Sequence, residues 1–150
     1  MSKKNKILCA LSGGVDSSVA AALLKEQGYD VIGITFKLFC YAKNTQRTKA
    51  CCSLEAIESA RQICQKLNIP HYIVDISKKF EKLIIQNFIS EYLAGRTPNP
   101  CIRCNSFIKF PTLISYAQGL GIDLVATGHY ARKSISQDSK GHNIYKILKA

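Results

Sequence analysis

The stretch KILCALSGGVDSS, residues Lys6 to Ser18, decides the fold. Its first half, KILCAL, is a short apolar run that ends at Gly13-Gly14, which is typical of a buried parallel β-strand. A helix over 17–27 is expected next, because apolar residues recur on one face and Gly28 supplies a stop signal. The stretch therefore predicts a strand, a glycine turn and a helix in succession.

The rest of the chain repeats this alternation. Strands are predicted over 30–36, 71–76 and 123–127, and helices over 54–67, 79–94 and 107–118. Two polar-flanked runs near the end, 132–135 and 143–148, predict a β-hairpin. The order predicts an α/β fold, a doubly wound and mostly parallel sheet with right-handed crossovers, Rossmann-like, with the hairpin at the C-terminal end.

Composition and charge limit the class of protein. A chain of 150 residues fits one domain. No apolar run of about 18 residues occurs and no secretory signal precedes the first strand, so we expect a cytoplasmic protein without a membrane span. The formal net charge of +11 leaves two interpretations open, a solvated basic surface or a polyanionic partner such as nucleic acid. Seven cysteines in such a protein favour metal binding or catalysis for some of them over a disulfide framework.

The glycine turn LSGGVDSS lies where ligands bind in open α/β sheets. Gly13 and Gly14 allow close approach of the backbone, and the amides at the start of the following helix favour an anion. Ser12, Ser17 and Ser18 add hydroxyl donors, and Asp16 is placed to orient the loop or to help hold a metal ion near phosphates. The alternative is a tight strand–helix turn with a polar cap. The stretch matches neither the Walker motif nor GxGxxG.

A second segment, TPNPCIRCN at Thr97–Asn105, brings two cysteines together. Its prolines predict a stiff, irregular loop rather than a helix. The loop would present Cys101 and Cys104, as a redox pair, as metal ligands, as a nucleophile with its neighbour, or as buried structural residues.

These segments together carry a resemblance to a known family. SGGVDSS resembles the PP-loop of the ATP pyrophosphatase superfamily, which holds the pyrophosphate of ATP while a substrate oxygen attacks the α-phosphate. With AGRTPNPCIRCN, the IKF after it, and ATGHYAR, the sequence is similar to the tRNA-specific 2-thiouridylases from about Lys6 to Arg132. Those enzymes adenylate the C2 oxygen of the wobble uridine and then introduce sulfur from a cysteine persulfide. The resemblance implies ATP and Mg²⁺, a tRNA substrate and a persulfide-donating sulfur-relay protein as partner.

The resemblance also assigns roles to residues. It places one run against the ATP phosphates, namely Ala10, Leu11, Ser12, Gly13, Gly14, Val15, Asp16 and Ser17. It implies that Phe36 and Gly128 contact the nucleotide. It implies contact with the tRNA for Asn99, Pro100, Cys101 and His129. Cys104 aligns with the catalytic cysteine of the family.

The sequence departs from the family at Cys101, where the commoner residue is an Asp that assists proton transfer. A thiol can serve as a base if its pKa is depressed, for which Arg96 and Arg103 are candidates. The alternative is that Cys101 and Cys104 are ligands of an iron–sulfur cluster or of structural zinc, with Cys51 or Cys52 or a cysteine from elsewhere completing the set.

The resemblance also concerns the extent of the chain. We expect a nucleotide-binding and adenylation domain over 1–131 and a hairpin over 132–150 that leads into a missing C-terminal portion. None of the seven cysteines aligns with the family's persulfide carrier, so no complete sulfur transfer is expected from the chain alone. Two other functions stay open, another PP-loop tRNA thiolase and a non-catalytic RNA-binding or iron–sulfur module.

Overall fold

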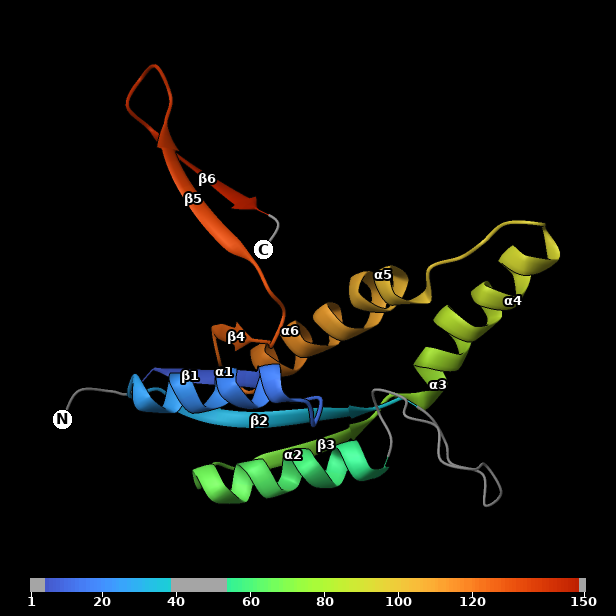
Figure 1. Ribbon diagram of the computed structural model, residues 1–150, viewed down its shortest axis with the longest axis horizontal. Helices are drawn as coiled ribbons and strands as arrows, with labels where there is room; N and C mark the ends of the chain where they lie inside the picture. The colour runs from blue at the N-terminus through green and yellow to red at the C-terminus, as the bar shows by residue number, and fades with distance from the viewer. Residues whose placement is uncertain (1–4, 39–53, 149–150) are drawn as a thin grey trace.

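A four-stranded parallel sheet forms the centre of the protein in the computed structural model, which describes residues 5–38 and 54–148. The strands run in the order β3-β2-β1-β4, with β1 at Lys6–Ala10, β2 at Asp30–Lys37, β3 at His71–Asp75 and β4 at Leu124–Ala126. A second sheet is the antiparallel hairpin of β5 (Arg132–Gln137) and β6 (Asn143–Leu148), which projects away from the first sheet (Figure 1). The predicted fold class and the C-terminal hairpin are therefore confirmed.

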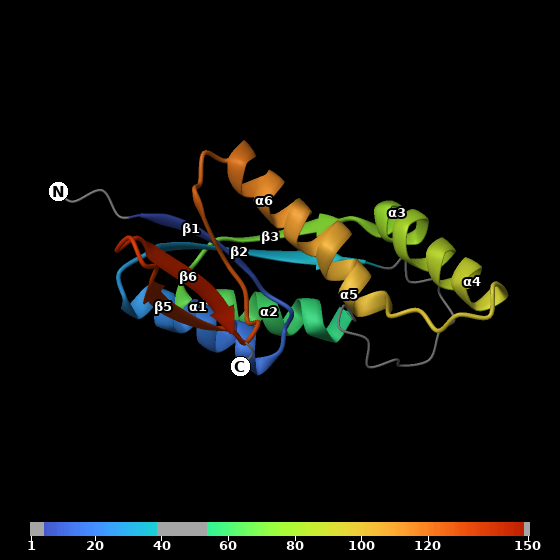
Figure 2. The same cartoon turned by 90° about the horizontal axis from the view of Figure 1, so that it is seen from above.

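Helices cover both faces of the sheet. Helices α1 (Val15–Glu26) and α2 (Leu54–Leu67) lie on one face and α6 (Phe110–Gly119) on the other (Figure 2). Two helical runs each contain a π-helical turn: α3 (Ser77–Phe80), η1 (Glu81–Ile85) and α4 (Gln86–Leu93), then α5 (Pro100–Cys104), η2 (Asn105–Lys109) and α6. No helix within 5–38 and 54–148 is long and apolar enough to cross a membrane.

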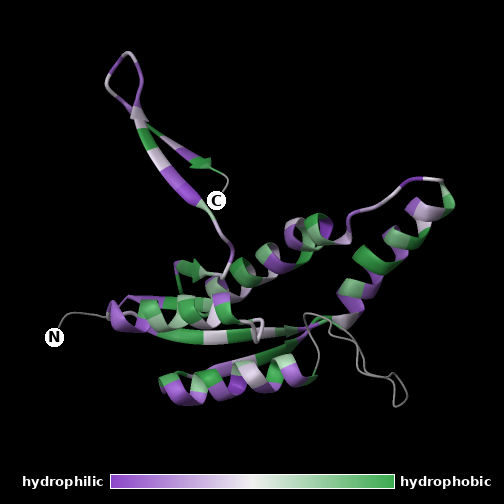
Figure 3. Cartoon of the chain, viewed as in Figure 1, coloured by the Kyte–Doolittle hydropathy of each residue, from purple (hydrophilic) through white to green (hydrophobic). Residues whose placement is uncertain are grey.

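Alternation along β1 divides the core into two clusters. Leu8 packs toward the face covered by α6, together with Ile108 and Leu113. Its neighbours Ile7 and Cys9 pack toward the opposite face. Apolar colouring accordingly follows the strands between the helical layers, whereas α2 carries hydrophilic residues on its outer side (Figure 3). Burial on both faces is what an apolar run such as KILCAL requires.

One prediction about local structure is wrong. Cys101 and Cys104 lie on α5, in a helix that begins at Pro100, and not in an irregular loop. Proline is well suited to the first helical position, because its missing N–H needs no partner there and its φ is already helical. Asn99 caps this helix, its side-chain oxygen accepting from the amide nitrogens of Cys101 at 2.7 Å and Ile102 at 3.2 Å.

Asp75 at the end of β3 connects two elements and gives a test at acid pH. Its carboxylate accepts from the Ser77 hydroxyl at 2.6 Å and from the Lys37 ammonium at 2.9 Å. These bonds, Ser77 first, hold the pKa of Asp75 well below its usual 3.8. A carboxylate with a lowered folded-state pKa stabilises the fold above its unfolded pKa, and this contribution is lost as the pH falls through the folded pKa.

We therefore expect Asp75→Asn to lower the free energy of unfolding at pH 7, and the difference from the parent to shrink below about pH 4. Urea denaturation over this pH range measures it, with the exposed Asp123→Asn as a control. A difference that stays constant down to the acid limit would contradict the assignment.

Candidate nucleotide site

A pocket of about 280 Å³ opens at the carboxyl ends of β1, β2 and β4. Its walls come from the turn after β1, the end of β2, the start of α6 and the segment after β4. The lining residues are Ala10, Leu11, Ser12, Gly14, Asp16, Ser17, Ile34, Thr35, Phe36, Leu38, Lys109, Phe110, Leu113, Thr127, Gly128 and His129. Ligands bind at this edge in open α/β sheets, so the pocket lies where the sequence predicted a site.

The turn between β1 and α1 is held by its serines. Ser17 Oγ donates to the Gly14 carbonyl at 3.2 Å and accepts from the Ser12 amide at 3.2 Å. Gly14 is the N-cap of α1, and no side chain caps the helix. Because the first amides of a helix have no partner within it, the N-terminus of α1 presents donors and a positive dipole end to the pocket.

Two glycines allow close contacts around this turn. Gly13 has φ +77°, and a Cβ there would overlap the Ala56 carbonyl in the first turn of α2. A Cβ on Gly128 would lie 2.5 Å from the Ser17 amide nitrogen. The glycines therefore let α2 and the segment after β4 pack directly against the turn.

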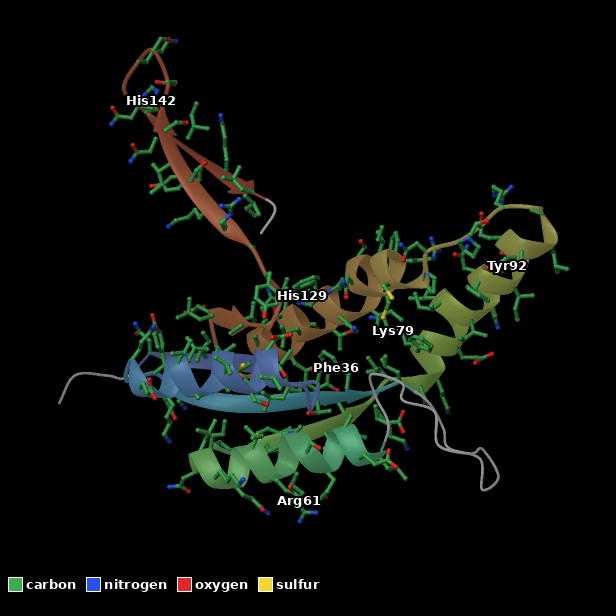
Figure 4. All side chains as sticks on the ribbon, in the orientation of Figure 1. Phe36, Arg61, Lys79, Tyr92, His129 and His142 are labelled. Atoms are coloured by element: carbon green, nitrogen blue, oxygen red, sulfur yellow. The ribbon has the colours of Figure 1, made fainter. Side chains whose placement is uncertain are left out.

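The segment after β4 closes one side of the pocket. The His129 ring lies beside α6, 5.2 Å from the Phe110 ring between centroids (Figure 4), and its Nδ1 is 3.0 Å from Thr127 Oγ1. The Tyr130 hydroxyl donates to Asp16 Oδ1 at 2.6 Å. This bond to a carboxylate raises the pKa of Tyr130.

A buried hydroxyl fixes the start of the turn. Thr35 Oγ1 donates to the Leu11 carbonyl at 2.9 Å and lies 2.8 Å from His71 Nε2. Since the hydroxyl has one proton and gives it to Leu11, His71 must donate from Nε2. Burial, and next the charge of Arg61, lower the pKa of His71, which favours the neutral ring.

Most of the residues predicted to contact the nucleotide line this pocket. Gly13 and Val15 are the exceptions among the predicted phosphate-binding residues, because neither lines the pocket. Gly13 packs against Ala56 of α2, and the Val15 side chain is 78% exposed to solvent. Residues that sequence reasoning did not assign also line the pocket, namely Ile34, Thr35, Leu38, Lys109, Phe110, Leu113 and Thr127. The IKF after the second cysteine was the available signal for Lys109 and Phe110.

The two cysteines of α5 lie outside the lining. Cys104 is 5% exposed and belongs to the same apolar cluster as Phe36 and Leu38, which do line the pocket. Cys101 is exposed, and neither cysteine forms a disulfide with another cysteine of the described ranges. Cys104 is thus buried in the cluster that borders the pocket and is not itself part of the lining.

The two arginines considered as activators of Cys101 have other partners. Arg96 forms a two-pronged ion pair with Glu91, with N–O distances of 2.5 and 2.9 Å. Arg103 Nε donates to the Leu83 carbonyl at 3.0 Å, and its guanidinium lies 4.8 Å from the centre of the Phe107 ring. These contacts tie α5 to η1 and to its own helical run.

Within 5–38 and 54–148 no group of three or more His, Cys, Asp or Glu is arranged to hold a metal ion. Cys51 and Cys52, the candidates for completing an iron–sulfur or zinc site, lie outside the described residues. The metal-site alternative for Cys101 and Cys104 therefore stays a prediction.

The parallel sheet, with helices on both faces and a glycine turn at its carboxyl edge, defines an α/β protein of the Rossmann-like type. The chain belongs to the family described as "tRNA methyl transferase HUP domain", whose model matches residues 5–149.

Curated relatives cover most of the chain. A tRNA-specific 2-thiouridylase MnmA from Geotalea uraniireducens is 49% identical over 98% of this chain and 39% of its own length. Enzymes of the same name from Clostridium botulinum and Caldanaerobacter subterraneus are 55% and 49% identical over 86% and 99% of the chain. The chain spans about two-fifths of the length of these relatives, 36% to 41%.

Two solved structures share the fold. A predicted subunit of tRNA methyltransferase from Methanocaldococcus jannaschii superposes with a TM-score of 0.55 at 17% identity, over 82% of this chain and 53% of its own. A glutamine-dependent NAD⁺ synthetase from Acinetobacter baumannii, in complex with ADP, superposes with a TM-score of 0.53 at 19% identity. The match covers 83% of this chain and 21% of the synthetase chain. At these identities the likeness concerns the fold alone.

Proposed function

We propose that the chain binds ATP and adenylates the C2 oxygen of the wobble uridine of tRNA, as the ATP-using part of a 2-thiouridylase. The observation that carries the proposal is the pocket at the carboxyl edge of the sheet, bounded by the uncapped N-terminus of α1. The names of the curated relatives indicate the substrate, and the net charge of +11 suits a polyanion such as tRNA.

The lining fits the two halves of ATP. Apolar side chains from β2 and α6, among them Phe36 and Leu113, suit the adenine ring. The amides at the N-terminus of α1 and the hydroxyls of Ser12 and Ser17 suit the phosphates. Gly128 brings backbone against the same end of the helix.

The same lining suits a divalent ion. Mg²⁺ binds in proteins through one or two carboxylates together with substrate phosphates, and Asp16 supplies a carboxylate at the mouth of the pocket. Ser12 and Ser17 supply further oxygens. When bound, the ion would neutralise charge on the phosphates.

Among the residues that line the pocket, Lys109 supplies the basic side chain of Lys or Arg type. We therefore assign its ammonium group to the phosphates. During attack on the α-phosphate, negative charge grows on the phosphoryl oxygens and on the departing pyrophosphate. An ammonium group in the pocket favours that charged state over the ground state, which is how such a group lowers a barrier.

The sulfur step would follow on the adenylated base. A sulfur nucleophile forms a bond to C2, and AMP leaves with the former C2 oxygen, because adenylation has made that oxygen a good leaving group. The terminal sulfur of a persulfide delivered by a partner protein would bond to C2. We assign to the Cys104 thiolate the attack on the inner sulfur, which breaks the persulfide S–S bond, forms a disulfide and leaves the terminal sulfur on the base. Because Cys104 is buried, its sulfur reaches the base only after neighbouring side chains move. Cys101 is the candidate for the general base, in the position where the family more commonly has an Asp.

Release of labelled pyrophosphate from ATP tests the proposal. With Mg²⁺ and a tRNA that has uridine at the wobble position, we expect release by the chain that depends on the tRNA. Lys109→Met should slow it by about a hundredfold and Lys109→Arg by much less, since one stabilising group of this kind contributes that much. Lys146→Met, on the exposed strand β6, is the control. tRNA binding without tRNA-dependent pyrophosphate release would favour the non-catalytic RNA-binding module.

A further inference from the structure

Tyr130 reaches from the segment after β4 to the first turn of α1. Its hydroxyl donates to Asp16 Oδ1 at 2.6 Å, across 114 positions of sequence. The ring itself is 75% exposed, so the residue contributes little to the core. The bond rather than packing is therefore the feature that needs an explanation.

The segment that carries Tyr130 is positioned by its own contacts. Gly128 packs against the backbone of Ser17, where any larger residue would collide. The His129 amide donates to Thr127 Oγ1 at 3.3 Å. These contacts hold the segment 127–130 at the edge of the pocket, so that the Tyr130 hydroxyl lies beside Asp16.

Asp16 occupies a place where a carboxylate has two possible partners. It is the second residue of α1, and acidic side chains in a first helical turn are attracted by the free amides and the positive dipole end. Those amides are the same donors that an anionic ligand in the pocket would use. In the structure the carboxylate binds the Tyr130 hydroxyl instead.

We propose that Tyr130 is a positioning residue of the nucleotide site, whose hydroxyl keeps the Asp16 carboxylate at the mouth of the pocket and so leaves the α1 amides to the phosphates. Without that hydroxyl, Asp16 turns to the amides and competes with the ligand as a second anion. This inference rests on the proposed ATP site and adds a residue that acts on the site through Asp16.

A double-mutant cycle tests the coupling. ATP binding is measured by calorimetry in EDTA, so that no divalent ion contributes, for the parent, Tyr130→Phe, Asp16→Asn and the double variant. We expect Tyr130→Phe to weaken ATP binding about tenfold or more, as for loss of a hydrogen bond to a charged group. Asp16→Asn should bind ATP more tightly than the parent. In the Asp16→Asn background, Tyr130→Phe should change the affinity by less than about twofold.

Adenosine and a second tyrosine separate this role from a structural one. Adenosine has no phosphates, so Tyr130→Phe should leave its affinity, measured by displacement, unchanged. Tyr145→Phe removes a hydroxyl from an exposed tyrosine on β6 and should leave ATP binding unchanged.

The outcomes distinguish the two proposals. If the parent binds ATP and Tyr130→Phe binds it equally well, the inference is wrong while the ATP site stands. An equal loss in the Asp16→Asn background, or an equal loss for adenosine, overturns it as well. A parent chain that binds no ATP overturns the proposed function together with this inference.

Discussion

Replacing Gly13 by alanine is expected to abolish ATP binding and to lower the free energy of unfolding by about 2 kcal/mol or more. Two causes add. The backbone of Gly13 is left-handed, which costs an L-residue about 1–2 kcal/mol. The new methyl group would also overlap the Ala56 carbonyl, and a backbone atom cannot turn aside as a side chain can. The turn must then move off α2, and the α1 amides move with it.

Gly14→Ala is the matched control for this prediction. Gly14 has φ −88° and ψ 167°, which any residue adopts, and a Cβ there would lie 3.4 Å from Ser12 Oγ. We expect a loss of at most about 1 kcal/mol, as for other changes at an N-cap. Urea denaturation and equilibrium dialysis with ATP measure both variants. Equal stability of the two alanine variants would show that Gly13 is not held against α2.

The second large effect is expected at Cys104. In a hybrid in which this chain replaces the aligned segment of the Clostridium botulinum relative, Cys104→Ser should reduce 2-thiouridine formation by about a thousandfold or more. Serine cannot carry a persulfide or supply a thiolate, so the sulfur step stops. Pyrophosphate release with tRNA should continue, because adenylation precedes the sulfur step. Mass spectrometry of digested tRNA measures the product.

Cys64→Ala provides the matched control, because Cys64 is another buried cysteine, on the opposite face of the sheet. Burial raises the pKa of its thiol to about 11, which makes it unreactive at neutral pH. This variant should keep its thiolation activity.

Iron and sulfide analysis of the parent and of Cys101→Ser decides the metal question: a cluster lost in Cys101→Ser would make Cys101 a ligand and remove Cys104 from the role of free nucleophile.

The sheet was predictable because each strand carries its own signal. KILCAL is too short and too apolar for anything but a buried strand before a glycine turn, and β1 begins at Lys6 as expected. Helix α2 matches its predicted range over 54–67, since its apolar spacing is regular and Pro70 follows closely. The hairpin followed from two runs on either side of a polar turn.

The start of α5 was not predictable from the same kind of signal. Proline interrupts a helix at most positions and begins one at the first, so Pro100 alone allows both interpretations. The available signal was Asn99 directly before Pro100, because asparagine is a common N-cap residue, and the structure confirms it as the cap that accepts two amides.

From the residues alone, the candidate site was predictable in its phosphate-binding turn, and the resemblance added Phe36, Gly128 and His129, which also line the pocket. LSGGVDSS is local, and the turn follows from it. Two other contacts join segments that are distant in the chain: Tyr130 with Asp16, and His71 with Thr35. The spacing of residues along the sequence does not predict such contacts. The burial of Cys104 depends in the same way on strands and helices brought together by the fold.

The π-helical turn η2 has a consequence for how the second helical run is compared between sequences. A π-turn holds more residues than an α-turn, so the residues before and after Asn105–Lys109 do not share one 3.6-residue period. Of the buried apolar positions, Cys104 and Ile108 are four residues apart, whereas Ile108 and Leu113, on either side of the end of η2, are five apart. A helical wheel drawn through the whole run would misplace one end, so the cysteine end and the pocket end must each be phased separately.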